Sequence, residues 1–302
     1  MSDRLSVFKT YKLYVGGKFP RSESGRVYEV TTKTSAAGAA GKGKWLANAP
    51  QSSRKDARDA VVAARKAFGG WSGATAYNRG QILYRIAEML EGRKDQFVRE
   101  VADAEGLSKS KASAVVDAAI DRWVWYAGWT DKIAQVVGGA NPVAGPYFNL
   151  SSPEPTGVVT VLAPQESSFL GLISVVAPVI ATGNTAVVIA SEKSPLPALS
   201  LGEVLATSDL PGGVVNVLSG RTAEIAAPLA AHQDVNAIDL AGADDVLAKE
   251  LEIAAADNLK RVLRPQPVDY AETPGIDRLT AFLETKTVWH PTGSLGASGS
   301  SY

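Results

Sequence analysis

The polar residues with the clearest chemical potential follow a strand-like run near the middle of the chain. Residues 157–169 read GVVTVLAPQESSF, so Glu166, Ser167 and Ser168 come shortly after a run of valine and leucine. A serine nucleophile needs a histidine as general base and often lies in a G-x-S-x-G turn, and neither stands beside these serines in the sequence. We therefore expect the two serines to cap a following helix.

The cysteine and histidine content limits the kinds of catalytic and metal site that the chain can form. The chain contains no cysteine, which excludes disulfides, thiolate metal sites and a thiol nucleophile. Its two histidines, His232 and His290, do not form an H-E-x-x-H or similar motif. From these patterns we predict no metal site and no catalytic residue.

The second half of the chain alternates between apolar strand-like runs and helix-like stretches. The strand-like runs cover 157–163, 185–190, 213–219, 236–241 and 260–263, and the helix-like stretches cover 170–181, 195–206, 222–231 and 244–256. Continuous Val, Ile and Leu strands separated by helices predict an α/β fold, a parallel sheet with helices on both faces. Ligands of such sheets bind beyond the carboxyl ends of the strands, so we expect any site there.

The first half is predicted to begin with β-structure and to continue with helices. Residues 11–30 alternate around Gly16 and Gly17, which predicts a hairpin, whereas residues 31–51 have no period and predict a loop. Ser53 followed by Asp56 predicts a capped helix start, and three more helices are expected, the last over 109–133. In that last helix Val116, Ile120, Trp123 and Tyr126 form a stripe. The tryptophans Trp123, Trp125 and Trp129 suggest a stacking platform, but aromatic residues at helical spacing favour a place in the core.

Two further strand-like segments lie outside the α/β pattern. Residues 138–156 have turn residues at both ends and predict a second, projecting hairpin, and residues 284–290 alternate like a strand. A proline-bearing connector precedes the latter, and the small, polar residues 291–302 predict disorder.

Overall charge and hydropathy argue against two classes of partner. Of the 302 residues, 31 are Lys or Arg and 31 are Asp or Glu, so there is no basic excess for nucleic acid. No apolar run approaches the length of a membrane span, and the first residues do not resemble a signal peptide. We expect a cytoplasmic protein.

Several segments together resemble the aldehyde dehydrogenase superfamily. They include YKLYVGGKF, KDARDAVVAARKAFGGWS, GVVTVLAP, ATGNTAVVIASEKSPLPAL and DLPGGVVNVLSG, and the similarity extends over nearly all of 11–262. The resemblance implies a Rossmann-like cofactor domain, a cysteine-bearing catalytic domain and a β oligomerisation arm that pairs with a neighbouring subunit. We assign 1–137 and 157–264 to the cofactor-binding-like domain, 138–156 and 280–290 to the arm, 265–279 to a connector, and 291–302 to a disordered tail.

The resemblance also shows where this sequence departs from the family. An A-P-W-N motif, whose amide stabilises an oxyanion, corresponds to residues 163–166, so Glu166 replaces the amide. A cofactor-binding lysine corresponds to Ile189, and the general-base glutamate corresponds to Pro265. The cysteine-bearing segment is not found between Pro265 and the arm strand. These departures imply a truncated homologue that is a pseudoenzyme.

A vestigial cofactor site is implied by the remaining positions. It comprises Leu162, Ala163, Pro164, Ser191, Glu192, Gly220 and Gly242. Gly242 allows two interpretations, a close approach of a pyrophosphate to a helix start or a strand-to-helix turn that needs glycine, and we favour the turn. We expect no cofactor, although NAD or NADP binding is possible if the crevice is competent.

Three functional hypotheses follow. In the first, the chain is a non-catalytic or regulatory subunit that associates with a full-length aldehyde dehydrogenase or with itself through the arm. In the second, it is an NAD(P)-binding oxidoreductase component of an aldehyde-oxidising complex. In the third, supported only by Glu192, Gly220 and Gly242, it is a nucleotide or metabolite sensor.

Overall fold

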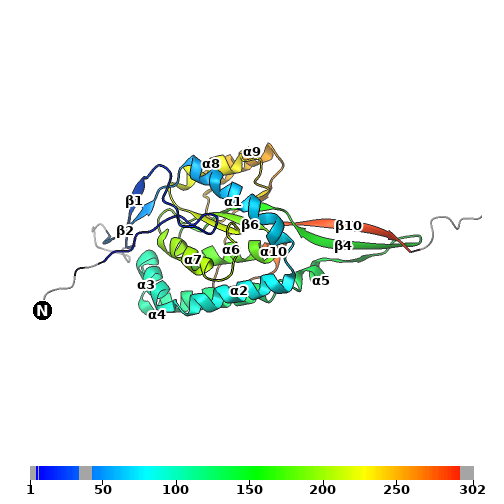
Figure 1. Ribbon diagram of the computed structural model, residues 1–302, viewed down its shortest axis with the longest axis horizontal. Helices are drawn as coiled ribbons and strands as arrows, with labels where there is room; N and C mark the ends of the chain where they lie inside the picture. Colours follow the sequence, from blue (N-terminus) through cyan, green and yellow to red (C-terminus); the bar gives the residue numbers. More distant parts are fainter. Residues whose placement is uncertain (1–4, 6, 34–42, 293–302) are drawn as a thin grey trace, which may run out of the picture.

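The computed structural model describes residues 5, 7–33 and 43–292. Its central element is a five-stranded parallel sheet with the strand order β7-β6-β5-β8-β9 (Figure 1). The strands are β5 (Val158–Leu162), β6 (Thr185–Ile189), β7 (Val215–Leu218), β8 (Ala237–Asp239) and β9 (Arg261–Leu263). Every residue of β5 and β6 is buried, as expected for strands that are covered on both faces. The predicted α/β fold is thus confirmed.

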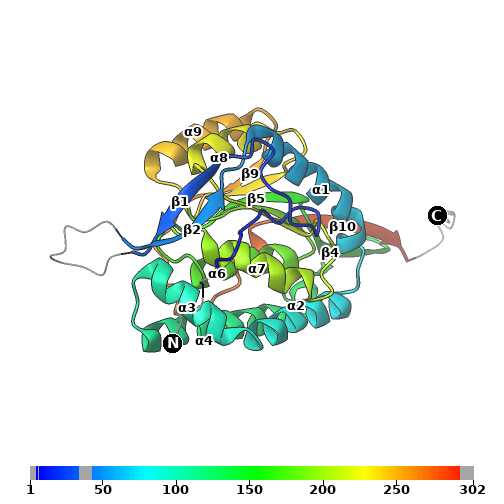
Figure 2. The same cartoon turned by 60° about the vertical axis from the view of Figure 1, so that its left-hand side comes forward.

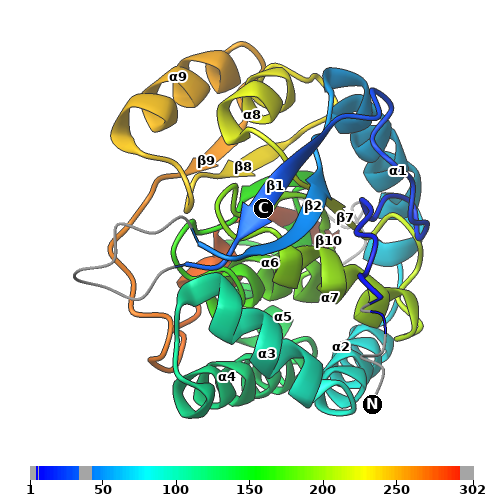
Figure 3. The ribbon, with the colours of Figure 1, turned by 90° about the vertical axis from the view of Figure 1, so that its left-hand side faces the viewer.

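Helices cover both faces of this sheet, and one face carries a second helical layer. The helices α1 (Arg54–Ser72), α8 (Thr222–Ala230) and α9 (Asp245–Ala256) lie on one side, and α6 (Leu170–Ala181) and α7 (Leu196–Ala206) lie on the other (Figure 3). Outside α6 and α7 lie α2 (Ala76–Glu91), α3 (Lys94–Glu105) and α4 (Lys109–Ala127) (Figure 2). The helices predicted from periodicity are all found.

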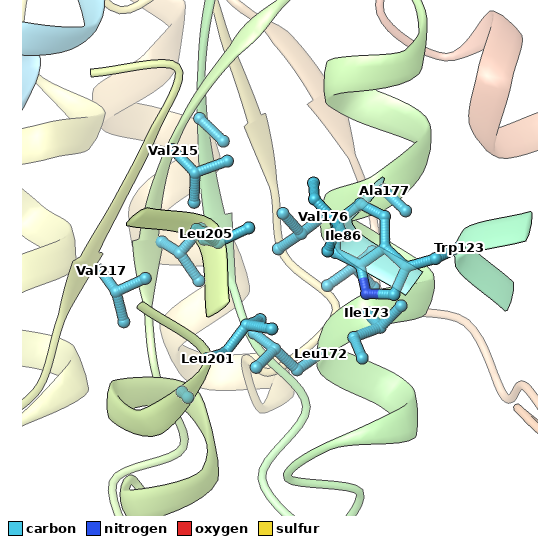
Figure 4. Close-up of a cluster of buried hydrophobic side chains, with 14 of the residues drawn as sticks. Ile86, Trp123, Leu172, Ile173, Val176, Ala177, Leu201, Leu205, Val215 and Val217 are labelled. Atoms are coloured by element: carbon cyan, nitrogen blue, oxygen red, sulfur yellow. The ribbon is translucent and has the colours of Figure 1, made fainter. Parts of the chain in front are cut away.

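The packing between the two helical layers explains the aromatic residues of α4. Trp123 is fully buried and lies beside Ile86, Ile173 and Val176 (Figure 4). Tyr126 is also fully buried, while Trp125 and Trp129 pack against the same core from its margin. The interpretation of this stripe as core is therefore confirmed.

A second sheet, three-stranded and antiparallel, is built from the segments that the sequence analysis assigned to the arm, and it is called the arm below. Its order is β10-β4-β3, with β3 (Gly139–Asn141), β4 (Tyr147–Pro155) and β10 (Leu283–Pro291). The strand β10 pairs with β4 along its whole length, from Leu283 opposite Pro155 to Pro291 opposite Tyr147. The two strands project together from the body of the molecule (Figure 1). The short helix α5 (Ile133–Val137) leads into β3.

The amino-terminal prediction was wrong in two respects. The hairpin expected around Gly16 and Gly17 is only a turn with one bridge between Val15 and Lys18, because Tyr14 pairs instead with Val217 on the edge of β7. The expected loop contains β2 (Trp45–Pro50), which pairs with β1 (Val27–Thr31). The alanines of WLANAP weaken its alternation, and the burial of Ala47 and Ala49 shows that they face the core.

Two smaller corrections concern the ends of elements. The helix expected over 109–133 ends at Ala127, because the chain turns at Gly128 before α5 begins. A short helix, α10 (Asp277–Thr280), which the sequence did not predict, spans the boundary between the connector and the segment assigned to the arm. Most of the predicted tail, residues 293–302, lies outside the described residues, as do residues 34–42 of the expected loop.

Within the described part of the chain, no helix combines the length and the apolar character that crossing a membrane requires.

Candidate functional site

An open cleft of about 970 Å³ lies where the sequence placed the site, beyond the carboxyl ends of the parallel strands. The turn after β5 supplies residues 164–167, and the turn after β6 supplies Glu192 and Lys193. The starts of α8 and α9 form two further walls, and the connector contributes Gln266, Val268 and Tyr270. In the described residues, no group of three metal-ligating side chains is found.

Three of the seven predicted site residues line this cleft, namely Pro164, Glu192 and Gly242. The other four, Leu162, Ala163, Ser191 and Gly220, are buried behind its wall. Ser191 has a clear structural task there, because its Oγ donates a hydrogen bond to the Gln165 carbonyl at 2.9 Å and accepts one from the Ser194 N–H at 3.2 Å. It thereby joins the turns after β5 and β6.

Glu166 stands at the mouth of the cleft between two lysines. Lys33 Nζ donates to one carboxylate oxygen at 2.6 Å, and Lys193 Nζ donates to the other at 2.7 Å. These bonds, first that from Lys193 and then that from Lys33, lower the pKa of Glu166 from its ordinary value of 4.5 to about 2. Glu166 is therefore an ionised carboxylate at neutral pH, and it would oppose rather than stabilise an oxygen that gains negative charge.

Carboxylates also occupy the two helix N-termini that face the cleft. Glu192 accepts hydrogen bonds from the Thr222 N–H at the start of α8, at 2.9 Å, and from Arg221 Nη1 at 2.6 Å. Asp244 caps α9, where its side chain accepts from the Leu247 N–H at 2.8 Å. Backbone N–H groups at helix starts commonly bind phosphate, but here the chain's own side chains already accept from them.

The two serines after β5 have different partners. Ser167 Oγ accepts a hydrogen bond from the Gly171 N–H at 2.9 Å, in the first turn of α6, whose N-cap residue is Phe169. The capping prediction therefore holds for Ser167 and is wrong for Ser168. Ser168 instead donates from both its N–H and its Oγ to Glu105 Oε1, at 2.8 Å and 2.9 Å. Burial raises the pKa of Glu105, and these bonds oppose the shift. Both hydroxyls therefore stabilise the turn between β5 and α6, which is a structural role.

The geometry around Gly242 supplies a packing reason for glycine. Its N–H donates to the Leu162 carbonyl at 2.9 Å, which brings the end of β8 close to the end of β5. A Cβ at this position would lie 1.9 Å from the Ala163 carbonyl oxygen. The favoured interpretation, a turn that needs glycine, agrees with this contact.

The connector forms part of the cleft wall and is held by two arginines that the sequence analysis missed. Arg122 on α4 donates to the carbonyls of Tyr270 and Glu272 at 2.7 and 2.8 Å. Arg278 on α10 donates to Asp239 at 2.7 Å, and the Asp239 side chain is 1% exposed. Burial raises the pKa of Asp239, and Arg278 opposes that shift. An aspartate inside the apolar run NAIDLA was the available signal that a buried partner exists.

Comparisons with known proteins identify the family of the chain. A model of the aldehyde dehydrogenase family matches residues 29–264. The putative aldehyde dehydrogenase DhaS of Bacillus subtilis is 32% identical over 271 residues, covering 87% of this chain and 52% of that protein. Retinal dehydrogenase 2 of Gallus gallus is 33% identical over 262 residues, covering 84% and 48%. The chain spans about half the length of the curated relatives it matches.

Solved structures show the same relationship. HpcC from Thermus thermophilus superposes with a TM-score of 0.78 at 28% identity, covering 84% of this chain and 47% of that one. An aldehyde dehydrogenase from Bacillus cereus, solved as an NAD+ complex, gives a TM-score of 0.75 at 27% identity, covering 84% and 50%. The Rossmann-like arrangement of the parallel sheet and its helices is thus shared with these structures.

Proposed function

Because the chain belongs to the aldehyde dehydrogenase family, we propose that it is a non-catalytic or regulatory member. It associates, in this proposal, with a complete aldehyde dehydrogenase or with a second copy of itself. The observation that carries the proposal is the short path from the central sheet to the arm. The strand β9 ends at Leu263 and β10 begins at Leu283, so only residues 264–282 separate them.

The chemistry of the cleft supports the absence of catalysis. The chain contains no cysteine, so it offers no thiol nucleophile. Glu166 is ionised at the position where the resemblance implies an amide that stabilises an oxyanion. Pro265 stands where the resemblance implies the general base, and its side chain has no titratable group.

The arm supports the proposed association. The strand β10 lies at the edge of its sheet, and among the described residues no strand pairs with its outer side. Four large side chains of the arm are exposed: Tyr147, Phe148, Leu150 and Trp289. An open strand edge beside exposed apolar side chains is suited to pairing with a strand of another subunit.

The two faces of the arm carry different side chains. Leu150 lies opposite Val288 and Phe148 lies opposite His290, so these four side chains share a face. The other face carries the rings of Tyr147 and Trp289, whose centroids are 5.8 Å apart. It also carries a row of hydrogen-bonded polar side chains, in which Asn141 donates to Asn149 and to Ser151, and Ser151 pairs with Thr287 at 3.0 Å. We place the contact with the partner on the face of Phe148 and Leu150 and along the outer edge of β10.

A second candidate is an NAD(P)-binding oxidoreductase component, and the volume and place of the cleft favour it. The carboxylates of Glu192 and Asp244 weigh against it, because a dinucleotide's phosphates would have to compete with them at both helix starts.

A fluorescence titration with NADH separates the two candidates. The first predicts no saturable signal at millimolar NADH, and no oxidation of aldehydes by the purified chain with NAD or NADP. Saturable NADH binding would support the second candidate, and turnover by the chain alone would overturn the first.

A further inference from the structure

A separate cavity of about 380 Å³ lies under the amino-terminal segment and shares no lining residue with the strand-end cleft. Its walls come from the chain around Phe8 to Tyr11, the turn from Arg21 to Arg26, and both ends of β2. This volume falls within the range of small-molecule sites, which is about 300–1,000 Å³. Neither the family resemblance nor the proposed association through the arm accounts for it.

Aromatic rings form one part of this cavity. The rings of Phe8 and Trp45 meet edge to face, with centroids 5.2 Å apart, and Trp45 is 39% exposed. Tyr11 adds a third ring to the lining. A partly exposed tryptophan held in this way presents a surface on which a planar ligand can stack.

The charges around the cavity are positive. Arg21, Arg26 and Lys9 line it, and no carboxylate does so among the described residues. Lys9 is already engaged, because its Nζ lies 3.0 Å from Glu203 and donates to Ser200 Oγ at 2.8 Å. Arg21 and Arg26 differ, since within residues 7–33 and 43–292 neither guanidinium has an ion pair or a hydrogen bond.

The two arginines stand on a rigid support. They flank a tight turn in which the Gly25 N–H donates to the Ser22 carbonyl at 2.9 Å. The buried Ser22 hydroxyl is fixed by Gln51 O at 2.6 Å and by Asp56 Oδ2 at 2.9 Å, which ties the turn to the start of α1. The acid of the turn, Glu23, faces Lys55 at 3.5 Å. A fixed turn with two available guanidinium groups is suited to binding an anion.

We propose that this cavity binds a small molecule that carries both an aromatic ring and an anionic group, either a carboxylate or a phosphate. The ring stacks on Trp45, and the anion is held by Arg21 and Arg26 through charge-assisted hydrogen bonds. The proposal is independent of the arm and of the strand-end cleft.

The test is isothermal titration calorimetry of the full chain with two probes, AMP for the phosphate class and phenylacetate for the carboxylate class. We expect at least one probe to bind with a Kd below about 1 mM. One stacked ring and one paired anion can provide an affinity of this order. Adenosine, which lacks the anion, and inorganic phosphate, which lacks the ring, are each expected to bind about tenfold more weakly. The tighter of the two probes identifies the anionic group.

Variants of the lining residues test whether the probe binds in this cavity. The Arg21→Gln/Arg26→Gln double variant is expected to raise the Kd by about tenfold or more, and Trp45→Leu by about tenfold. Arg99→Gln is the matched control, since Arg99 is an exposed arginine of α3 outside the cavity, and it should leave the Kd unchanged. Circular dichroism checks that each variant is folded. The absence of saturation by both probes, or a Kd that the double variant does not alter, would overturn the proposal.

Discussion

The strand-end cleft and the arm differ in what their side chains leave available to a ligand or a partner. In the cleft, the carboxylates of Glu166, Glu192 and Asp244 are bonded to lysines, to an arginine or to helix N–H groups of the same chain. In the arm, Phe148 and Trp289 are 47% and 57% exposed, and the outer edge of β10 is unpaired among the described residues. Internal bonds thus occupy the carboxylates at the expected active site, whereas the described part of the arm leaves apolar side chains exposed and one strand edge unpaired.

The largest effect is expected from the ion pair that fixes the connector between these two regions. Arg278→Ala leaves the buried Asp239 without its partner and is expected to lower the free energy of unfolding by about 3 kcal/mol. Urea denaturation measures this change. Because burial raises the pKa of Asp239 and the opposing arginine is gone, the variant should regain stability as the pH is lowered toward protonation of Asp239.

The control for this variant is Arg85→Ala, which removes an exposed pair with Glu88 on α2 and should cost less than about 1 kcal/mol. A similar, small loss in both variants would mean that the connector is not held by Asp239.

A smaller effect is expected from filling the close contact behind the cleft. Gly242→Ala would place a Cβ against the Ala163 carbonyl and is expected to destabilise the fold by about 2 kcal/mol, measured as a shift in the urea midpoint. Gly69→Ala on α1 is the matched control, because a Cβ there meets no atom within 4 Å, and it should be neutral or stabilising by up to about 1 kcal/mol. A neutral Gly242→Ala would remove the packing explanation for this glycine.

The smallest effect on stability concerns the lysines around Glu166. Lys193→Met removes the larger cause of the lowered pKa, so the pKa of Glu166 should rise from about 2 toward 4.5. Because the folded pKa lies below the unfolded value, the pair's contribution is present above about pH 4.5 and is lost as the pH falls toward 2. An NMR titration of the side-chain carboxyl measures the shift.

Glu166 is largely exposed, so the accompanying change in unfolding free energy should be about 0.5 kcal/mol or less. A pKa that Lys193→Met leaves unchanged would contradict the role given to this lysine.

The elements that the sequence predicted well are those specified by local patterns. The capping box of Ser53 and Asp56 is present at the start of α1, and the apolar runs that became β5 and β6 were recognised to within two residues. Such features depend on residues close in the chain, and their physical causes are local.

The features that sequence reasoning missed depend on contacts between distant residues. Arg122 binds a carbonyl 148 residues away, and nothing in its neighbourhood marks it as a support for the connector. The same holds for Lys33, whose partner Glu166 is 133 residues away. Of the seven predicted site residues, four lie behind the cleft wall. Leu162 ends β5, and Ala163, Ser191 and Gly220 stand at the buried beginnings of the turns that follow β5, β6 and β7, whereas the cleft is lined farther along these turns.

The most direct test of the central claim is native mass spectrometry of the tagged chain, purified from its own host. The Phe148→Ser/Leu150→Ser variant, which alters two exposed side chains on the proposed contact face of the arm and should leave the fold intact, is purified in parallel. The account predicts that the wild-type chain is recovered in a stoichiometric complex with a complete aldehyde dehydrogenase or as a homo-oligomer, and that the variant is recovered alone. A wild-type monomer, or a complex that the arm variant does not weaken, would contradict the account.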